Sequence, residues 1–290
     1  MFVQQTVNGI ALGAVYALVA VGFSLMFNVM DLVNFAHGGV ILIGCYAAFY
    51  AMTLAGLPPA LALVPALAAG LVLSLLSERA VLRPMRRRGS PPIYFFMASF
   101  MLFTFLESLV SVLTGAQVTA YPRPIASAVF HVGGAIVTAQ SLFTLLAAML
   151  GLWGMWFVLR HTRVGLAIKM ATQDPVAATL MGVDLERVTT LAFGMAGVLA
   201  GAAGFFLGGT LGVYPQVGEV VYQAFIASLI GGLDSLTGAV LGAFLLGFIQ
   251  TYITAYLSSD LATILTFVFL IVLLIVRPQG LLGVSREEKV

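Results

Sequence analysis

Long runs of apolar residues, separated by short polar segments, occupy most of the chain. A helix needs about 20 apolar residues to cross the hydrocarbon core of a membrane. The pattern therefore predicts an all-α fold, a polytopic bundle of about eight crossings, between seven and nine. The predicted spans are Val7–Asn28, Gly39–Leu54, Ala60–Leu76, Ile93–Leu113, Ser141–Leu159, Val188–Gly208, Val220–Gly231, Thr237–Tyr256 and Ala262–Val276.

Positive charge is concentrated in three short stretches that lie between or after these runs. Cationic side chains resist translocation, so short loops rich in them stay in the cytoplasm. The first stretch follows the third run, which places the N-terminus outside, and the last stretch places the C-terminus inside. Of the 13 Lys and Arg residues, only Arg123 lies elsewhere. The stretches contain Arg79, Arg83, Arg86, Arg87 and Arg88; Arg160, Arg163, Lys169 and Arg187; and Arg277, Arg286 and Lys289.

The number of crossings depends on the shortest run, Val220–Gly231. Chain ends on opposite sides of a membrane require an odd number of crossings. There are two alternatives. Either this run crosses the membrane as a thin segment, which gives nine crossings, or the region Val220–Tyr256 crosses once with a re-entrant piece, which gives seven. No linker or low-complexity segment interrupts the chain, so we expect residues 1–290 to form a single transmembrane domain.

Composition agrees with a protein that uses lipid as its solvent. The chain is 61% hydrophobic and 8% charged, with a mean hydropathy of +1.09, whereas soluble domains carry about 25% charged residues. The net charge of +2 lies in loops beside the membrane, and the basic blocks lack interleaved aromatic residues, which argues against nucleic-acid binding. A single cysteine, Cys45, excludes a disulfide within one chain.

Many of the 31 glycines lie inside the apolar runs. Small residues spaced four apart allow the backbones of neighbouring membrane helices to approach closely. Gly197 and Gly201 have this spacing, as do Gly238 and Gly242. We therefore expect tight helix packing at these positions.

The segment Asp31–Gly39 interrupts two apolar runs with polar residues and a glycine pair. Irregular backbone at membrane depth is tolerated where protein or a water-filled cavity satisfies it, and such breaks often face a substrate path. Asn34 and His37 then line or gate the path. Alternatively, the segment is an ordinary turn in which Asn34 caps the next helix. A later break, Gly231–Ser235, is similar in kind and hints weakly at an inverted repeat.

Glu107 lies in the middle of the predicted span Ile93–Leu113. A carboxylate at the centre of a bilayer costs a few kcal/mol, so it should face the interior of the bundle or a polar cavity. It serves either as a polar contact in a translocation path or as a helix–helix hydrogen bond in its protonated form.

The second basic loop contains the signature of a short capped helix. Asp174 and Pro175 have the order of an N-cap followed by proline in the first turn. Gly182 stands where a glycine would end the helix. An isolated helix this short is unstable in water, so it needs a surface on which to dock.

Small residues make this helix suitable for docking into a partner protein. Ala177, Ala178 and Gly182 would allow close seating of the helix in a socket. The alternative is that the helix packs against cytoplasmic helix ends of its own chain.

Several kinds of chemistry are excluded or disfavoured by the sequence. No Walker nucleotide-binding loop, G-x-x-x-x-G-K-[ST], occurs, so the chain does not bind ATP through such a loop. His37, His131 and His161 are too far apart in sequence to indicate a metal site, and no catalytic constellation stands out. We expect no catalytic residues, no cofactor and no metal. On these residues alone, a secondary transporter, a channel and an intramembrane enzyme are left open.

Motifs in a fixed order cover nearly the whole chain. They are Asn34-Phe35-Ala36-His37-Gly38, Thr162-Arg163-Val164-Gly165, Asp174 with Ala177-Ala178-x-Leu180-Met181-Gly182-Val183, Gly231-Gly232-Leu233-Asp234-Ser235-Leu236-Thr237-Gly238-Ala239 and Arg277-Pro278-Gln279-Gly280-Leu281-Leu282-Gly283. With these motifs the chain resembles the LivH-type permeases of branched-chain amino acid ABC importers.

The resemblance implies a division of labour among several proteins. A periplasmic binding protein captures substrate, this chain and a second homologous permease form the path through the lipid membrane, and two ATPase subunits drive transport from inside. The expected substrates are leucine, isoleucine and valine, although related systems import urea, short amides, other amino acids or aromatic acids. The residues expected to couple the chain to the ATPases are Gly165, Lys169, Asp174, Ala177, Ala178 and Gly182.

The chain departs from the family pattern at three positions. Val176 stands where an acid is common, Lys169 where arginine is usual and Asp234 where glycine is more frequent. The usual downstream Ile-x-Leu-Pro is also missing. The contacts that an acid at position 176 would make with the ATPase are therefore left unassigned.

Overall fold

The computed structural model describes residues 2–122, 128–132 and 135–283, and most of them are helical. Each predicted span falls on one of these helices, which confirms the expected helical bundle, whereas Arg123, Arg286 and Lys289 lie outside the described residues. The helices are α1 Phe2–Met30, α2 Ala36–Thr53, α3 Pro59–Ser77, α4 Arg83–Arg87, α5 Pro92–Thr114, α6 Ala139–His161, α7 Arg163–Gln173, α8 Pro175–Leu180, α9 Leu185–Leu211, α10 Val220–Gly231, α11 Leu236–Tyr256 and α12 Ser259–Val276.

Three short elements supplement the long helices. A π-helical turn, Glu78–Leu82, joins α3 to α4, and a 3₁₀ turn, Pro215–Glu219, precedes α10. Strands β1 (Val129–Val132) and β2 (Ala135–Thr138) form an antiparallel hairpin before α6. An open strand edge is not stable in hydrocarbon, so the hairpin lies outside the lipid core.

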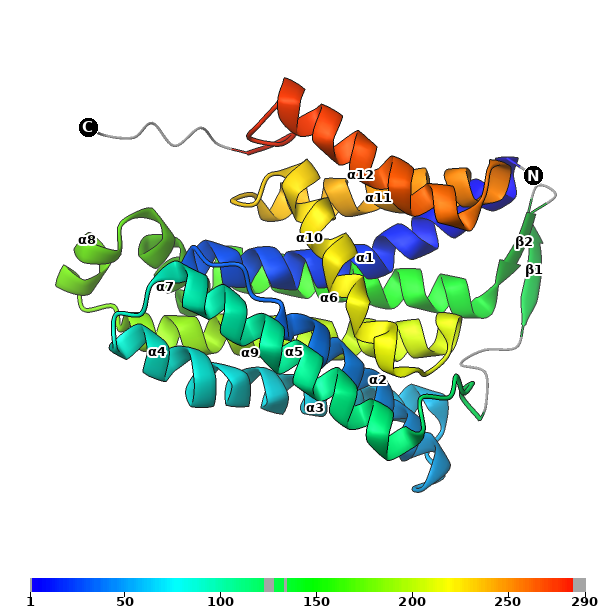
Figure 1. Cartoon of the computed structure of the whole chain (residues 1–290), viewed down its shortest axis with the longest axis horizontal. Coiled ribbons are helices and arrows are strands. Elements are labelled where there is room, and N and C mark those ends of the chain that lie inside the picture. Colours follow the sequence, from blue (N-terminus) through cyan, green and yellow to red (C-terminus); the bar gives the residue numbers. More distant parts are fainter. Residues whose placement is uncertain (1, 123–127, 133–134, 284–290) are drawn as a thin grey trace.

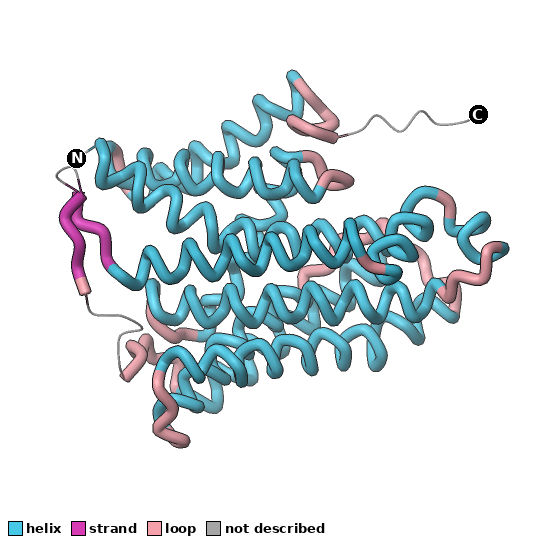
Figure 2. Tube along the Cα trace, turned by 180° about the vertical axis from the view of Figure 1, so that it is seen from behind, coloured by secondary structure: helices cyan, strands magenta, loops and turns pink. Residues whose placement is uncertain are grey.

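The elements divide between two ends of an elongated bundle (Figures 1 and 2). Helices α4, α7 and α8 lie at one end, which we call the basic end because the first two basic stretches lie there, and the last turn of α12 lies nearer the middle of the bundle. The N-terminus of α1 and the β1–β2 hairpin lie at the opposite end, the hairpin end (Figure 1). That the termini lie on opposite sides of the membrane stays a prediction from the charge pattern.

The chain crosses the bundle between α9 and α11, although α10 is too short to do so alone. At the hairpin end, the side chain of Gln140 donates a hydrogen bond to the carbonyl of Gly209 near the end of α9. Toward the basic end, the backbone N–H of Leu282 donates to the carbonyl of Gly231 at 2.9 Å. A 12-residue helix covers only about 18 Å, and the irregular segment from Gly212 to Glu219 covers the rest. Among the described residues, seven helices are long and apolar enough to cross a membrane on their own, and α10 and α12 are not among them.

Close backbone contacts hold the inner helices together, as the glycine spacing predicts. A Cβ atom added at Gly70 on α3 would lie 2.9 Å from the Cα atom of Gly201 on α9. A Cβ atom added at Gly242 on α11 would lie 2.9 Å from the backbone nitrogen of Gly231 on α10. Neither position leaves room for a side chain, so backbone rather than side-chain packing sets the distance between these helices.

Candidate functional site

The first break, between α1 and α2, is held by its own polar groups. Asp31 adopts a positive φ of 55°, and the chain then runs along the bundle before α2 begins part-way between the two ends (Figure 1). The side-chain oxygen of Asn34 accepts a hydrogen bond from the backbone N–H of Ala36 at 3.1 Å. The N–H of Phe35 donates to the hydroxyl of Ser99 on α5 at 3.2 Å. Asn34 is therefore buried and forms a local turn just before α2, whose N-cap position is Phe35 and has no side-chain cap.

His37 is enclosed on the first turn of α2. Its side chain is 1% exposed, and a Cβ atom added at Gly22 on α1 would lie 3.0 Å from its Nε2 atom. Among the described residues, neither ring nitrogen has a hydrogen-bond partner of ordinary geometry. The ring therefore packs between α1 and α9 and does not reach an open face of this chain.

A second break at membrane depth lies before α10, and the sequence reasoning missed it. Val213 pairs with Thr119 as an isolated antiparallel bridge, and the 3₁₀ turn Pro215–Glu219 follows. This turn lies against the start of α2, because a Cβ atom added at Gly38 would lie 2.7 Å from the carbonyl oxygen of Gly218. The predicted break Gly231–Ser235 lies instead toward the basic end. A usable signal was the cluster of glycine, proline and acidic residues just before the short apolar run.

An aromatic cluster surrounds the place where the two breaks meet. The ring of Phe35 lies at its centre, with an edge-on contact to Phe96 at 5.6 Å between centroids and a tilted contact to Tyr222 at 5.6 Å. The cluster joins residues from α1, the first break, α5 and α10. Its members are Phe23, Phe35, Phe96, Phe100, Phe103, Tyr222 and Phe225.

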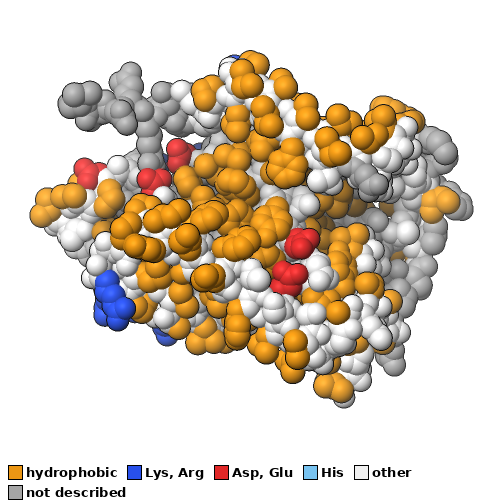
Figure 3. All heavy atoms as spheres, in the orientation of Figure 1, with side chains coloured by type: hydrophobic (Ala, Val, Ile, Leu, Met, Phe, Trp, Pro, Cys, Tyr) orange, Lys and Arg blue, Asp and Glu red, His pale blue; other side chains and the backbone are white. Residues whose placement is uncertain are grey.

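Two carboxylates stand beside this cluster on the outer face of the chain. Glu107 on α5 is partly exposed and Glu219 at the start of α10 is exposed, and they are close enough for their charges to interact. Tyr222 lies within the electrostatic range of both. Figure 3 shows acidic side chains within an otherwise hydrophobic face. Exposed acids at this depth are costly against lipid, so this face requires water or protein next to it.

The basic end contains an ion-pair network that fixes α4 against α9. The carboxylate of Glu78 is fully buried, accepts from Arg86 at 3.0 Å and accepts from the hydroxyl of Thr190 at 3.3 Å. Glu186 on α9 pairs with Arg83 and, at 2.7 Å, with Arg87. Sequence reasoning assigned the first arginine stretch to membrane orientation alone, and the structure adds a packing role.

The short helix α8 has the caps that the sequence predicts. One oxygen of Asp174 accepts from the backbone N–H groups of Val176 and Ala177, each at 2.9 Å. Gly182 has a φ of +84°, and the N–H of Val183 donates to the carbonyl of Ala178 at 3.0 Å. These bonds form a Schellman motif at the C-terminal end of the helix.

The exposed surface of α8 differs from the predicted one. Ala178 is 1% exposed and faces its own chain, so it cannot be part of a socket contact with another protein. Val176, Leu180 and Met181 are instead exposed, at 72%, 84% and 77%. Ala177, Gly182, Asp174 and Lys169 are exposed as well, whereas Gly165 is buried at the corner between α6 and α7.

Two of the sequence motifs meet toward the basic end. The N–H of Leu281 donates to the carbonyl of Ile230 at 2.8 Å, beside the bond from Leu282 to Gly231. Gly232 and Gly280 both have positive φ, and a Cβ atom on Gly280 would lie 2.6 Å from the nitrogen of Gly232. The motif after α12 thus clamps the turn between α10 and α11.

Comparison with known proteins identifies the family. Residues 5–276 match the model of the permease component of branched-chain amino acid transport systems. The chain belongs to this family. It is 31% identical to LivH, the high-affinity branched-chain amino acid transport system permease of Salmonella typhimurium, over 100% of this chain and 98% of that protein. It is 29% identical to BraD of Pseudomonas aeruginosa with the same coverage.

A solved structure extends the comparison of the fold. The complex of PsaBC from Streptococcus pneumoniae with a Fab contains a chain that matches with a TM-score of 0.53 and 12% identity. The match covers 94% of this chain and 91% of the other. At this identity the likeness concerns the fold alone, and it supports the helical-bundle fold of this chain.

The structure separates the residues that the sequence grouped as candidates. Glu107 lies on the open face, whereas Asn34 and His37 are buried behind it. All three nevertheless surround the junction of the two breaks. Among the described residues no cluster of potential metal ligands occurs.

Proposed function

We propose that this chain is a permease subunit of a binding-protein-dependent importer for branched-chain amino acids. The observation that carries the proposal is the exposed pair Glu107 and Glu219 at membrane depth beside an aromatic cluster. This face is unsuited to lipid and suited to a path that a second permease closes from the other side. Membership in the branched-chain amino acid permease family supports the substrate class.

The chemistry of the face fits such a substrate. A branched-chain amino acid has an apolar side chain and an ammonium group. The rings around Phe35 offer an apolar surface, and the carboxylates of Glu107 and Glu219 attract a cation. Asn34 and His37 are buried behind this face and hold the start of α2 in place.

The positive-inside rule places the basic end in the cytoplasm and the N-terminus in the periplasm. In this orientation α7 and α8 face the two ATPase subunits. The chain forms a single transmembrane domain. The exposed apolar side chains of Val176, Leu180 and Met181 form the contact, and Asp174 and Gly182 fix the ends of the helix. The buried residues Gly165 and Ala178 hold helices α7 and α8 against the rest of the chain. A periplasmic binding protein docks at the hairpin end.

The proposal is tested by placing single cysteines on two exposed faces. Cys45 is fully buried, so the wild-type background is low. Thr104→Cys lies on α5 one turn from Glu107, and Leu150→Cys lies on the outer face of α6, 67% exposed. In proteoliposomes that contain the assembled importer, a charged methanethiosulfonate reagent should modify Thr104→Cys and leave Leu150→Cys unmodified. Equal protection of both would place the Glu107 face in lipid and contradict the proposal.

Transport provides the second arm of the test. Leucine and the binding protein should slow the modification of Thr104→Cys, because substrate occupies the path. Replacing both acids, Glu107→Gln with Glu219→Gln, should reduce ATP-driven leucine uptake at least about tenfold, since a hydrogen bond to a charged group is worth roughly 1.5–3 kcal/mol. Unchanged uptake would remove the acids from the path.

A further inference from the structure

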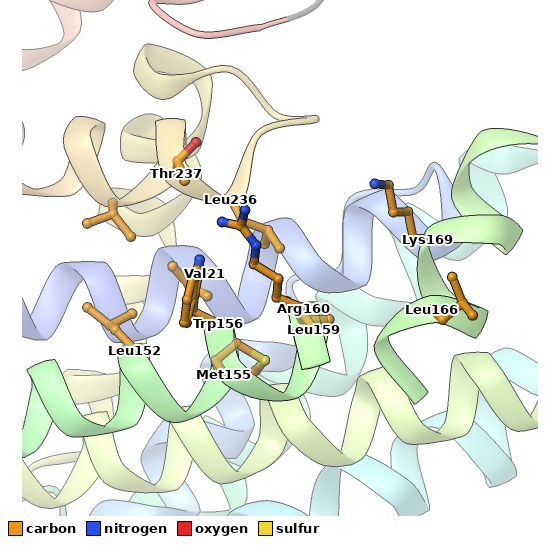
Figure 4. A pocket seen from close by; sticks show the side chains of 11 residues that line it. Val21, Leu152, Met155, Trp156, Leu159, Arg160, Leu166, Lys169, Leu236 and Thr237 are labelled. Carbon is orange, nitrogen blue, oxygen red and sulfur yellow. The ribbon is translucent and has the colours of Figure 1, made fainter. Parts of the chain in front are cut away.

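A cavity of about 500 Å³ lies between α1, α6, α7 and α11, away from the aromatic cluster and the two acids. Apolar side chains, among them Leu152, Met155 and Val240, line its floor. Two cations, Arg160 on α6 and Lys169 on α7, also line it. Figure 4 shows the ends of both cationic side chains on the same side of the cavity.

The cavity extends from the basic end into the membrane. Leu152 and Arg160 are eight positions apart on α6, so about 12 Å separates the apolar floor from the guanidinium-bearing residue along the helix. Trp156 lies between them, and the carbon of the guanidinium is 5.4 Å from the centre of its ring. Tryptophan with a neighbouring cation is typical of the boundary between hydrocarbon and headgroups.

The two cations that line the cavity stand outside the salt-bridge network of the basic end. That network joins Arg83, Arg86 and Arg87 to Glu78 and Glu186. No ion pair of Arg160 or Lys169 occurs in the part of the chain that the structure describes. The positive charges of Arg160 and Lys169 therefore lie beside an apolar groove. A ligand with a negatively charged headgroup and an apolar tail would match both features.

We propose that this cavity binds an anionic phospholipid, with one acyl chain along the floor and the phosphate between Arg160 and Lys169. Basic pockets between membrane helices are a known form of lipid headgroup site, and the volume lies within the usual range of ligand pockets, about 300–1,000 Å³. A cytoplasmic protein would not reach the floor, which lies at membrane depth. The bound lipid would tie α7, which precedes the coupling helix α8, to α6.

Native mass spectrometry of the purified full-length chain, alone and in the assembled importer, tests the site. The probes are phosphatidylglycerol, phosphatidylcholine and inorganic phosphate. We expect one phosphatidylglycerol to be retained in preference to phosphatidylcholine. Arg160→Gln with Lys169→Gln should weaken its binding roughly 30-fold, as expected for two cations near a membrane surface. The matched control, Arg79→Gln with Arg88→Gln, removes two exposed cations of the first stretch and should leave binding unchanged.

Filling the groove tests the acyl-chain part of the proposal. Leu152→Trp should reduce retention of the lipid, whereas Leu150→Trp on the outer face of α6 should not. Equal retention of both lipids, or full retention by the double glutamine variant, would overturn the proposal. Displacement of the lipid by inorganic phosphate would indicate a simple anion site. Loss of the lipid when the ATPase subunits bind would assign the groove to a protein partner. The readout is independent of uptake, so its failure and that of the proposed transport function are distinguishable.

Discussion

Helices α9 and α6 have almost the same hydropathy, 1.8 and 2.0, and yet they occupy opposite environments. Within the chain, 78% of the apolar stretch of α9 is buried, compared with 17% of that of α6. The difference follows from residue size. On α9, Gly197, Gly201 and Gly204 meet the backbones of α3 and α2, whereas a Cβ atom at Gly154 on α6 would meet nothing within 4 Å. Hydropathy therefore identifies a membrane span, and small residues decide which spans lie inside.

The outer helices need a cover that this chain does not supply. Large apolar side chains on α5 and α6, such as Met101, Phe105 and Trp153, are exposed. Lipid can cover the outer face of α6, and a second permease is proposed to cover the acidic face that includes α5. Substitutions at matched positions on the inner and outer helices test whether backbone contact makes this difference.

The largest effect is expected from a side chain at an inner glycine. Gly201→Leu on α9 would place a branched side chain against the backbone of α3 at Ala66, where no flexible group can move away. Overpacking of a core costs about 1–3 kcal/mol and occasionally more, and here we expect at least about 3 kcal/mol and loss of the folded protein. Size-exclusion chromatography and the thermal midpoint in detergent measure it.

The matched control for this substitution is Gly154→Leu on α6. It introduces the same side chain into a helix of similar hydropathy, at a position with open space. We expect a monodisperse protein with a thermal midpoint close to that of the wild type. Equal destabilisation by both variants would show that helix propensity, rather than backbone contact, controls stability.

A smaller effect is expected where α4 meets the inner helix α9. Glu78→Gln would leave Arg86 without its buried partner, while the size of the side chain stays the same. Removing one partner of a buried pair costs about 3–5 kcal/mol, and we expect about 2 kcal/mol because Arg86 is 29% exposed. Arg187→Gln breaks an exposed pair with Asp184 and should cost less than about 1 kcal/mol. Chemical denaturation in mixed micelles compares the two, and equal losses would contradict a special role for the buried pair.

The sequence alone was sufficient for the long apolar helices, their order and the caps of α8, whereas α4 and the β1–β2 hairpin were not predicted. Apolar runs and basic stretches are local signals, and Asp174, Pro175 and Gly182 act on neighbouring backbone groups. The partial span Val220–Gly231 was predicted with the bounds that the structure shows. The sequence left seven and nine crossings open, and among the described residues seven helices are long and apolar enough to cross a membrane on their own.

The candidate site depended on contacts that no local pattern contains. Glu107 and Glu219 are far apart in the sequence, and only the meeting of two breaks brings them together. The small size of Ala178 suggested a docking residue. The direction in which its side chain points depends on how α8 lies against α7 and α9, which no local pattern contains. The Glu78 network was hidden for the same reason, since its partners come from α4 and α9.

The smallest structural effect is expected outside both groups of helices, at Gly182 after α8. Gly182→Ala retains open space around the new methyl group but forces alanine into a positive φ of 84°, at a cost of roughly 1 kcal/mol. Gly89→Ala after α4 is a matched control, because Gly89 has a φ of 64° and equally open surroundings. Both variants should keep the thermal midpoint of the bundle within a few degrees. If α8 couples the permease to the ATPases, only Gly182→Ala should slow ATP-driven uptake, by about fivefold at most for 1 kcal/mol. An equal loss of uptake in both variants would trace the effect to strain at the basic end in general and not to the coupling helix.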